Sequence, residues 1–159
     1  MTENLTPWAI VDGVPAFLDF LRDVFDAEET VRMTTEDGSR VVHAEARIGG
    51  SPLMMFDSAP GWPPTAAYLR VYVPDVDATV ERALRHGSRV VTVPTTLPFG
   101  DRIARLAARW DNLWWVHTRV GDAKPEPDDD DLRAMAAVGA SLEQEMLRRG
   151  KSVDSGGAG

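Results

Sequence analysis

The segment RVVHAEARIG, residues 40–49, alternates side chains capable of acid–base or ionic chemistry with small apolar ones. In a β-strand, His43, Glu45 and Arg47 share one face, and the other face is apolar, made of Val42, Ala44, Ala46 and Ile48. Same-face neighbours lie about 7 Å apart, given the rise of a strand. This spacing suits two hydrogen bonds to one small molecule, or a histidine tuned by a nearby carboxylate. The alternative is a solvated strand face with ordinary ion pairs.

Aromatic side chains gather at the middle and in the second half of the chain. Tyr68, Arg70 and Tyr72 share one face of an expected strand, and Trp115 belongs to the last one. Together they predict a pocket wall that stacks against a flat or apolar ligand. Trp62, in the proline-rich segment 58–65, is expected to close over that pocket. The alternative, usual for aromatic residues, is that they form the core.

Two further polar groups belong to the same half of the chain. His117 shares a strand face with Trp115, so it either points into the pocket or lies at its rim, bound to water. Asp101 and Arg102 are adjacent in the sequence FGDR. We expect them to form a structural ion pair, and the alternative is that Arg102 binds a ligand anion.

The composition excludes several kinds of site. The 159 residues suit one domain, and the absence of cysteine excludes disulfides, thiol nucleophiles and cysteine-bound metals. A formal net charge of −8 and the lack of a Lys/Arg cluster argue against nucleic-acid binding. No apolar run approaches the roughly 20 residues of a membrane span, and the N-terminus does not resemble a secretory signal. The sequence therefore predicts a cytoplasmic protein without membrane contact.

The elements that would position these residues follow the same order twice. The first set is a strand at 6–11, a helix after Asp12 as N-cap, and strands at 30–34, 40–48 and 52–57, with a hairpin turn at 36–39. The second set is a strand at 69–73, a helix between the N-cap Asp75 and Gly87, and strands at 89–93, 102–109 and 113–120. This repetition predicts two tandem βαβββ modules.

The last part of the chain, 122–159, is different in character. It is expected to contain an acidic linker, a helix over 132–149 and a disordered tail from residue 152. The helix carries an apolar stripe of Leu132, Met135, Leu142 and Met146. That stripe needs a partner, which is either the domain itself or a second subunit.

The tandem modules resemble the vicinal oxygen chelate superfamily of glyoxalases, bleomycin-resistance proteins and extradiol dioxygenases, and within it the PhnB-like branch. The resemblance covers residues 1–121, with module one at 5–57 and module two at 66–120. It implies an α+β fold in which curved mixed sheets surround a cavity, with an additional C-terminal helix here. The segments that carry it are PWAIVDGVPAFLDFLRDVFDAEE, HAEARIGGSPLMMFD, YVPDVDATVERALRHGSRVV, and FGDR followed by LWWVHT.

The resemblance also implies where a divalent metal would bind. Family members hold it with His, Gln or Glu from the first and last strands of each module. The matching positions here are Leu5 or Thr6, Met54 or Met55, Tyr68 or Arg70, and Trp115. None of these is a good metal ligand, so we expect no metal cofactor. The alternative is a rearranged site made of His43, Glu45 and His117.

The resulting prediction is a metal-independent protein that holds a hydrophobic or aromatic metabolite or antibiotic in an aromatic-lined cavity. If it is an enzyme, which the sequence does not decide, His43 or Glu45 would transfer a proton as in an isomerase, and Arg70 or Arg102 would stabilise negative charge. One alternative is a metal-dependent lyase, isomerase or dioxygenase. Another is a partner-binding domain whose functional surface is the C-terminal helix. The resemblance implies a homodimer.

Overall fold

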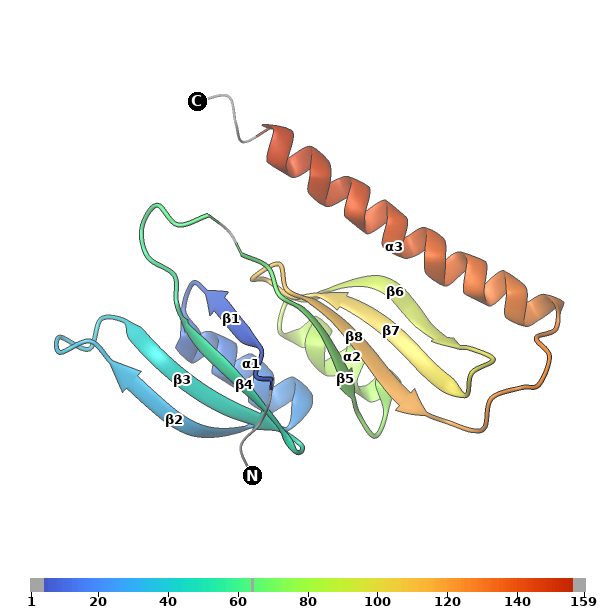
Figure 1. Cartoon of the computed structure of the whole chain (residues 1–159), viewed down its shortest axis with the longest axis horizontal. Coiled ribbons are helices and arrows are strands. Elements are labelled where there is room, and N and C mark those ends of the chain that lie inside the picture. The colour runs from blue at the N-terminus through green and yellow to red at the C-terminus, as the bar shows by residue number, and fades with distance from the viewer. Residues whose placement is uncertain (1–4, 64, 156–159) are drawn as a thin grey trace.

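The computed structural model describes residues 5–63 and 65–155, which form two β-sheets, each with a helix on one side, and a long third helix (Figure 1). The first sheet has the strand order β1-β4-β3-β2, with β1 parallel to β4 and the other pairs antiparallel. The elements of this first module are β1 (Trp8–Val11), α1 (Val14–Phe25), β2 (Glu28–Thr34), β3 (Val41–Ile48) and β4 (Ser51–Asp57).

The second module repeats this plan. Its strand order is β5-β8-β7-β6, again with the first strand parallel to the last. Its elements are β5 (Tyr68–Tyr72), α2 (Val76–Arg85), β6 (Arg89–Thr96), β7 (Asp101–Ala107) and β8 (Leu113–Arg119). The α+β fold of tandem modules with mixed sheets is therefore confirmed. Strand β6 extends three residues beyond the predicted end, because Thr95 and Thr96 still pair with β7.

The helices α1 and α2 pack against each other and join the two modules in one core. Trp114 of β8 is 1% exposed, and its ring centroid lies 4.5 Å from that of Phe25 in α1. Arg82 of α2 donates to the carbonyl oxygen of Val24 from Nη2 at 2.9 Å. Burying a large apolar side chain stabilises a fold by about 1.5–3 kcal/mol, so this shared core fixes one module against the other.

The two equivalent helices begin with different caps. Asp75 caps α2 as predicted, since its side chain accepts a hydrogen bond from the Ala78 amide at 3.0 Å. The prediction of Asp12 as the cap of α1 is wrong. Gly13 is the N-cap with a φ of 88°, and Asp57 at the end of β4 accepts from the amides of Gly13 and Val14. A carboxylate distant in sequence therefore replaces the local cap.

Each sheet has a second side, turned away from α1 and α2, which we call its open face. Side chains alternate between the two sides, so Ala44 and Ala46 are buried on the helix side of β3 while His43 and Glu45 lie on the open face. In the second sheet, Ala104 and Leu106 lie on the helix side, and Arg105 lies on the open face with Thr92.

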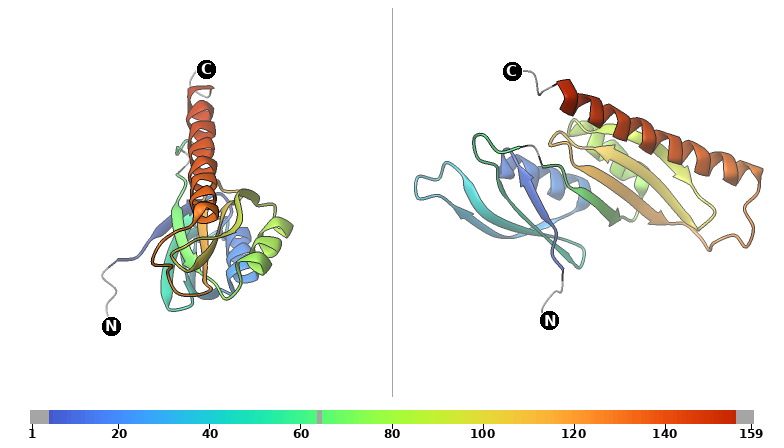
Figure 2. Two further views of the ribbon diagram at one scale, coloured as in Figure 1. Left: turned by 90° about the vertical axis from the view of Figure 1, so that its right-hand side faces the viewer. Right: turned by 45° about the horizontal axis from the view of Figure 1, so that its top comes forward.

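The third helix, α3 (Asp129–Ser155), covers part of the open face of the second sheet (Figures 1 and 2). It packs along β6, on the side opposite α2, and Ser141 bonds to Thr92 at 2.7 Å. The helix runs to Ser155, four residues into the segment 152–159 that was predicted to be a disordered tail, and 156–159 lie outside the described residues. None of the three helices, within the described ranges, combines the length and hydropathy that a membrane-spanning segment requires.

Of the four residues in the predicted apolar stripe of α3, three are exposed and Leu142 is half-buried. Leu132, Met135 and Met146 are 54%, 43% and 36% exposed, whereas Val138 and Glu145, which contact the sheet, are 7% and 3% exposed. Within the chain, therefore, α3 uses a mostly polar side for packing, and its apolar stripe remains largely exposed.

Candidate functional site

The polar row of β3 lies on the open face of the first sheet. His43 Nε2 and Glu45 Oε1 are 2.9 Å apart, and their side chains are 25% and 30% exposed. The small residues between them point at α1, which is why this row faces outward. Arg47 donates to the carbonyl oxygen of Gly50 in the adjoining turn.

A run of aromatic rings borders His43. Trp8 lies with its ring centroid 5.7 Å from that of His43 and 5.4 Å from that of Phe56. Trp62 continues the run, 6.0 Å from Phe56. The predicted closing residue Trp62 also shares a second cavity with Arg109 and Trp110, and no ring contact joins it to Trp115 in the described part of the chain. No hydrogen bond, ion pair or ring contact joins His43 or Glu45 to the second module in the described part of the chain.

The predicted aromatic wall is assembled on the open face of the second sheet. Arg70 is paired with Trp115 across the strands, and Tyr72 with His117. The Tyr68 and Trp115 ring centroids are 6.2 Å apart, and those of Tyr72 and His117 are 5.3 Å apart. Tyr68 and Tyr72 are 54% and 52% exposed. The register of a parallel strand pair therefore brings together five of the residues singled out from the sequence.

A buried carboxylate lies at the centre of this wall. Asp101 is 1% exposed, and its Oδ2 accepts hydrogen bonds from His117 Nδ1 at 3.0 Å and from the Tyr72 hydroxyl at 3.1 Å. Arg119 Nε lies 3.1 Å from Oδ1 in ion-pair contact, without the alignment of a hydrogen bond. Arg70 Nη2 is 3.7 Å from Oδ2 and also donates to the Tyr72 hydroxyl.

The groups around Asp101 and His117 determine the protonation state of these two side chains. Burial by itself raises the pKa of Asp101, but the hydrogen bonds from His117 and Tyr72 and the charge of Arg119 outweigh it and lower the pKa. Burial lowers the pKa of His117, and the charges of Arg70 and Arg105 add to this against the hydrogen bond to Asp101. The pair at neutral pH is therefore an ionised carboxylate and an uncharged imidazole.

The predicted ion pair between Asp101 and Arg102 is wrong. Successive residues of a strand point to opposite sides, so Asp101 reaches the open face while Arg102 reaches the helix side. There Arg102 binds both carboxylate oxygens of Asp77 in α2, at 2.6 and 2.8 Å. The structure therefore does not bring Arg102 to the aromatic wall.

Two members of the wall were missed from the sequence, namely Asp101 in its contact with His117, and Arg105. Arg105 is 7% exposed, lies over the Trp115 ring at 5.4 Å, and donates to Thr92 and to the Val138 carbonyl of α3. Burial lowers its pKa, and no carboxylate of the described chain pairs with it. Strand alternation in RIARLAAR places Arg105 on the Asp101 side, which was the available signal.

A cavity of about 360 Å³ adjoins the wall, within the size range of small-molecule sites. It lies between β5 and the turn that joins β3 to β4, where the two modules meet. Arg70 and Tyr72 line it from the second module, and Pro7 and Pro52 line it from the first. The same two β5 side chains therefore touch both the cavity and the Asp101–His117 pair.

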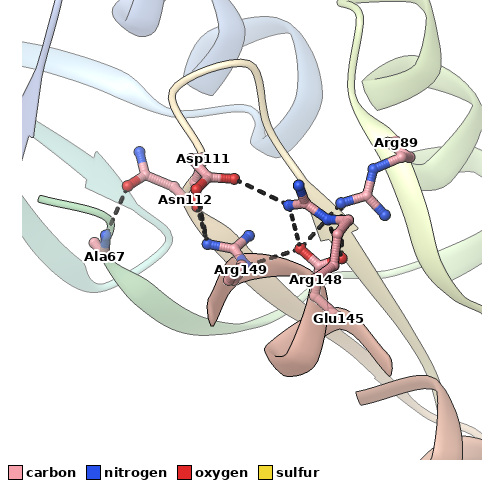
Figure 3. Close-up of polar contacts among 7 residues, drawn as sticks. All are labelled: Ala67, Arg89, Asp111, Asn112, Glu145, Arg148 and Arg149. Atoms are coloured by element: carbon pink, nitrogen blue, oxygen red, sulfur yellow. Dashed lines mark hydrogen bonds and ion pairs between the residues drawn. The ribbon is translucent and has the colours of Figure 1, made fainter. Parts of the chain in front are cut away.

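The C-terminal part of α3 is fixed to the second module by ionic contacts (Figure 3). Glu145 accepts hydrogen bonds from Arg89 of β6 and from Arg148 and Arg149 of its own helix, at 2.7 to 3.1 Å. Burial raises the pKa of Glu145, but these three arginines outweigh it and lower the pKa to about 2. Arg149 also binds Asp111 at 3.2 Å, beside the wall residue Tyr68.

The family-type metal positions do not carry a fitting set of donors. Of the positions that the resemblance assigns to ligands, Met54 lies on β4 opposite Trp8, and Arg70 is paired with Trp115. Indole, thioether and guanidinium groups do not hold a divalent cation of the zinc or manganese type. No cluster of three or more His, Asp or Glu side chains suited to a metal occurs in residues 5–63 and 65–151.

Comparison with known proteins agrees with this fold. The model of the Glyoxalase/Bleomycin resistance protein/Dioxygenase superfamily matches residues 6–116. A protein named Rv0887c from Mycobacterium tuberculosis (strain ATCC 25618 / H37Rv) is 32% identical over 143 residues, covering 82% of this chain and 80% of its own. The Mycobacterium bovis protein Mb0911c is also 32% identical over 143 residues, covering 82% of this chain and 90% of its own.

Solved structures share the fold at low sequence identity. TioX from Micromonospora sp. ML1 has a TM-score of 0.61 and 19% identity, covering 75% of this chain and all of its own (100%). The fosfomycin resistance protein FosX from Listeria monocytogenes has a TM-score of 0.57 and 16% identity, covering 74% of this chain and 93% of its own. A PhnB protein from Bacillus cereus has the same TM-score and identity, covering 73% of this chain and 99% of its own. At these identities the likeness concerns the fold alone.

Proposed function

Because this chain belongs to the glyoxalase/bleomycin resistance protein/dioxygenase superfamily, we propose that it binds a small aromatic molecule without a metal, on the open face of its second module. The observation that carries the proposal is the pair of half-exposed rings, Tyr68 and Tyr72, set beside Trp115 and next to a cavity. Exposed rings on a rigid sheet offer stacking area at little cost in side-chain entropy. FosX from Listeria monocytogenes, which shares the fold, is a fosfomycin resistance protein.

The charges at this site favour a ligand that carries polar groups on a flat body. Arg70 has a 56% exposed side chain and lies over the Tyr72 ring at 4.9 Å, so its guanidinium can reach both the cavity and solvent. His117 adds a polar atom at the inner end of the wall. The proposed ligand therefore stacks on the tyrosine and tryptophan rings and hydrogen-bonds at its edge.

The proposal is tested by isothermal titration calorimetry with 4-nitroanisole, a neutral flat probe. Tyr72→Ala removes the ring that borders both cavity and wall, and we expect the Kd to rise about tenfold from the lost stacking area. Trp8→Ala removes a comparably exposed ring from the other module and is expected to leave the Kd within about twofold. Weakening by Trp8→Ala alone would place the site on the first module and contradict the proposal.

A second candidate is acid–base catalysis by the predicted residues His43 and Glu45. Their contact of 2.9 Å, next to Trp8, is a specific observation in its favour. The pair lies on the first open face, away from the wall, so it would serve a different ligand position. It stays a prediction, and a His43 variant enters the experiments below.

The exposed stripe of α3 supports the proposal that the chain forms a homodimer. Leu132, Met135 and Met146 present apolar surface to solvent along one side of a long helix, as an interface between two copies requires. Native mass spectrometry tests this proposal and metal independence together. We expect a dimer with twice the mass of the polypeptide and no added metal. Met135→Glu should convert it to a monomer. Stoichiometric zinc, iron or manganese that His43→Ala abolishes would instead favour the metal-dependent enzyme.

A further inference from the structure

Each of the three histidines lies beside a carboxylate, and the three pairs differ in burial. His86 and Asp23, which join α2 to α1, are 32% and 42% exposed. His43 and Glu45 are 25% and 30% exposed, so water competes for both partners. His117 and Asp101 have side chains that are 8% and 1% exposed. A hydrogen bond to an ionised carboxylate is stronger at low dielectric, so Asp101 holds the imidazole of His117 in one orientation.

The hydrogen bond to Asp101 determines which nitrogen of His117 carries the proton. An ionised carboxylate can only accept, so the proton of the 3.0 Å contact belongs to Nδ1 of His117. In the uncharged imidazole, Nε2 is then the acceptor. This atom has no hydrogen-bond partner within the described chain, yet it is not among the polar atoms shut off from solvent.

The groups around His117 come from three strands and have distinct roles. From β5, Tyr72 donates to the same carboxylate oxygen, and Arg70 is held at the Tyr72 hydroxyl. From β7 come Asp101 itself and the cation Arg105, and Arg119 of β8 reaches Oδ1. Arg105 is buried, whereas the side chains of Arg70 and Arg119 are 56% and 59% exposed. Of these three cations, Arg70 is the one that lines the cavity.

From this geometry we propose that His117 Nε2 accepts the proton of a weakly acidic hydroxyl group on an aromatic ligand at the wall, and that Arg70 pairs with the resulting oxyanion. The inference rests on the proposed aromatic site and assigns it a chemistry. The O–H bond breaks, its electron pair stays on the ligand oxygen, and an N–H bond forms at Nε2. Asp101 stabilises the imidazolium, so the transfer is reversible and needs no further reactant.

The experiment uses 4-nitrophenol, whose ionised form is coloured, and compares it with its methyl ether, 4-nitroanisole. With the protein in excess, we expect the ionisation constant of bound 4-nitrophenol to increase about tenfold or more over free probe, which equals one pKa unit. The readout is the phenolate absorbance across a pH titration. 4-Nitroanisole has no proton to give and reports binding to the wall alone.

The main variant is His117→Asn, whose amide nitrogen can still donate to Asp101 while the Nε2 acceptor is lost. We expect it to abolish the ionisation shift and to leave 4-nitroanisole binding within about twofold. His86→Asn is the matched control, because His86 is paired with Asp23 away from both candidate sites, and it should keep both. Nitrogen NMR of the wild-type chain provides a measurement without any variant, in which His117 should carry its proton on Nδ1 at neutral pH.

The outcomes are distinguishable. Binding of both probes with no shift in ionisation, or a shift that persists in His117→Asn, would overturn the proton acceptor and leave the aromatic site intact. A His117 protonated on Nε2 at neutral pH would overturn it as well. If neither probe binds the wild-type chain, the aromatic site itself is wrong and the proton acceptor falls with it.

Discussion

At the scale of residues, the position of Asp101 explains most of the chemistry of the second module. Asp101 and Arg102 are neighbours in sequence, but strand alternation sends one to Asp77 and leaves the other among Tyr72, His117 and Arg119. A buried carboxylate that accepts from a buried donor is costly to remove, because the N–H of the buried His117 would lose its partner. Asp101 therefore orients His117 rather than binding a ligand itself.

This orientation predicts the effect of Asp101→Asn on His117. Asn keeps an acceptor for Nδ1–H but removes the negative charge that favours the imidazolium, so the pKa of His117 should fall further below its ordinary value. Proton NMR titration of the ring signals measures this, with His86 as the internal reference because it is paired with Asp23 instead. An unchanged or higher pKa for His117 would show that Asp101 does not act on it through charge.

The sequence was sufficient to place Tyr68, Arg70 and Tyr72 on one face and Trp115 beside them, because the two-residue period of strands is a local property. It was insufficient for Arg105. The burial of that residue depends on α3, which packs on β7 from a distant part of the chain. Likewise, Trp62 could not be assigned to Phe56 from composition alone, since the path of a proline-rich connection is set by tertiary contacts.

At the scale of elements, α3 is bound to its sheet mainly by polar groups. Its apolar contacts form a small separate cluster of Leu97, Ile103, Ala134 and Val138, while the longer part of the contact consists of Arg105 to Val138, Thr92 to Ser141 and the Glu145 ion pairs. The N-terminal end is closed by reciprocal hydrogen bonds between Asp128 and Asp131, at 2.9 and 3.0 Å. Separating such a helix from the sheet should therefore cost less free energy than unfolding the shared core.

Glu145 makes that separation dependent on pH. Its pKa is lowered from 4.5 to about 2 in the folded chain, so its contribution is complete above about pH 4.5 and is lost as the pH falls towards 2. Glu145→Gln should remove the contribution at neutral pH as well, costing on the order of 3 kcal/mol for a broken buried ion pair. Hydrogen exchange of the α3 amides measures the opening, and the exposed Glu143→Gln is the control. Equal exchange in the two variants would contradict this role.

At the scale of the whole molecule, two similar modules expose different open faces. On the first module, no helix of the described chain covers the open face, where Trp8 and Met33 are 46% and 57% exposed. On the second module, α3 covers part of the open face. The duplication was predictable because the order of strands, helix and turns recurs along the chain. The different roles proposed for the two open faces were not predictable, because they depend on where α3 packs and on which strand edges meet at the cavity.

The proposed function depends on where an aromatic molecule binds, and NMR of the full chain titrated with 4-nitroanisole measures that position directly. The five tryptophans provide separate indole signals, of which Trp115 lies at the wall and Trp8 and Trp62 lie beside the first module. We predict a saturable shift of the Trp115 indole together with the amides of Tyr72 and His117. Shifts confined to Trp8 and Trp62, or no saturable shift at any indole, would contradict binding at the wall of the second module.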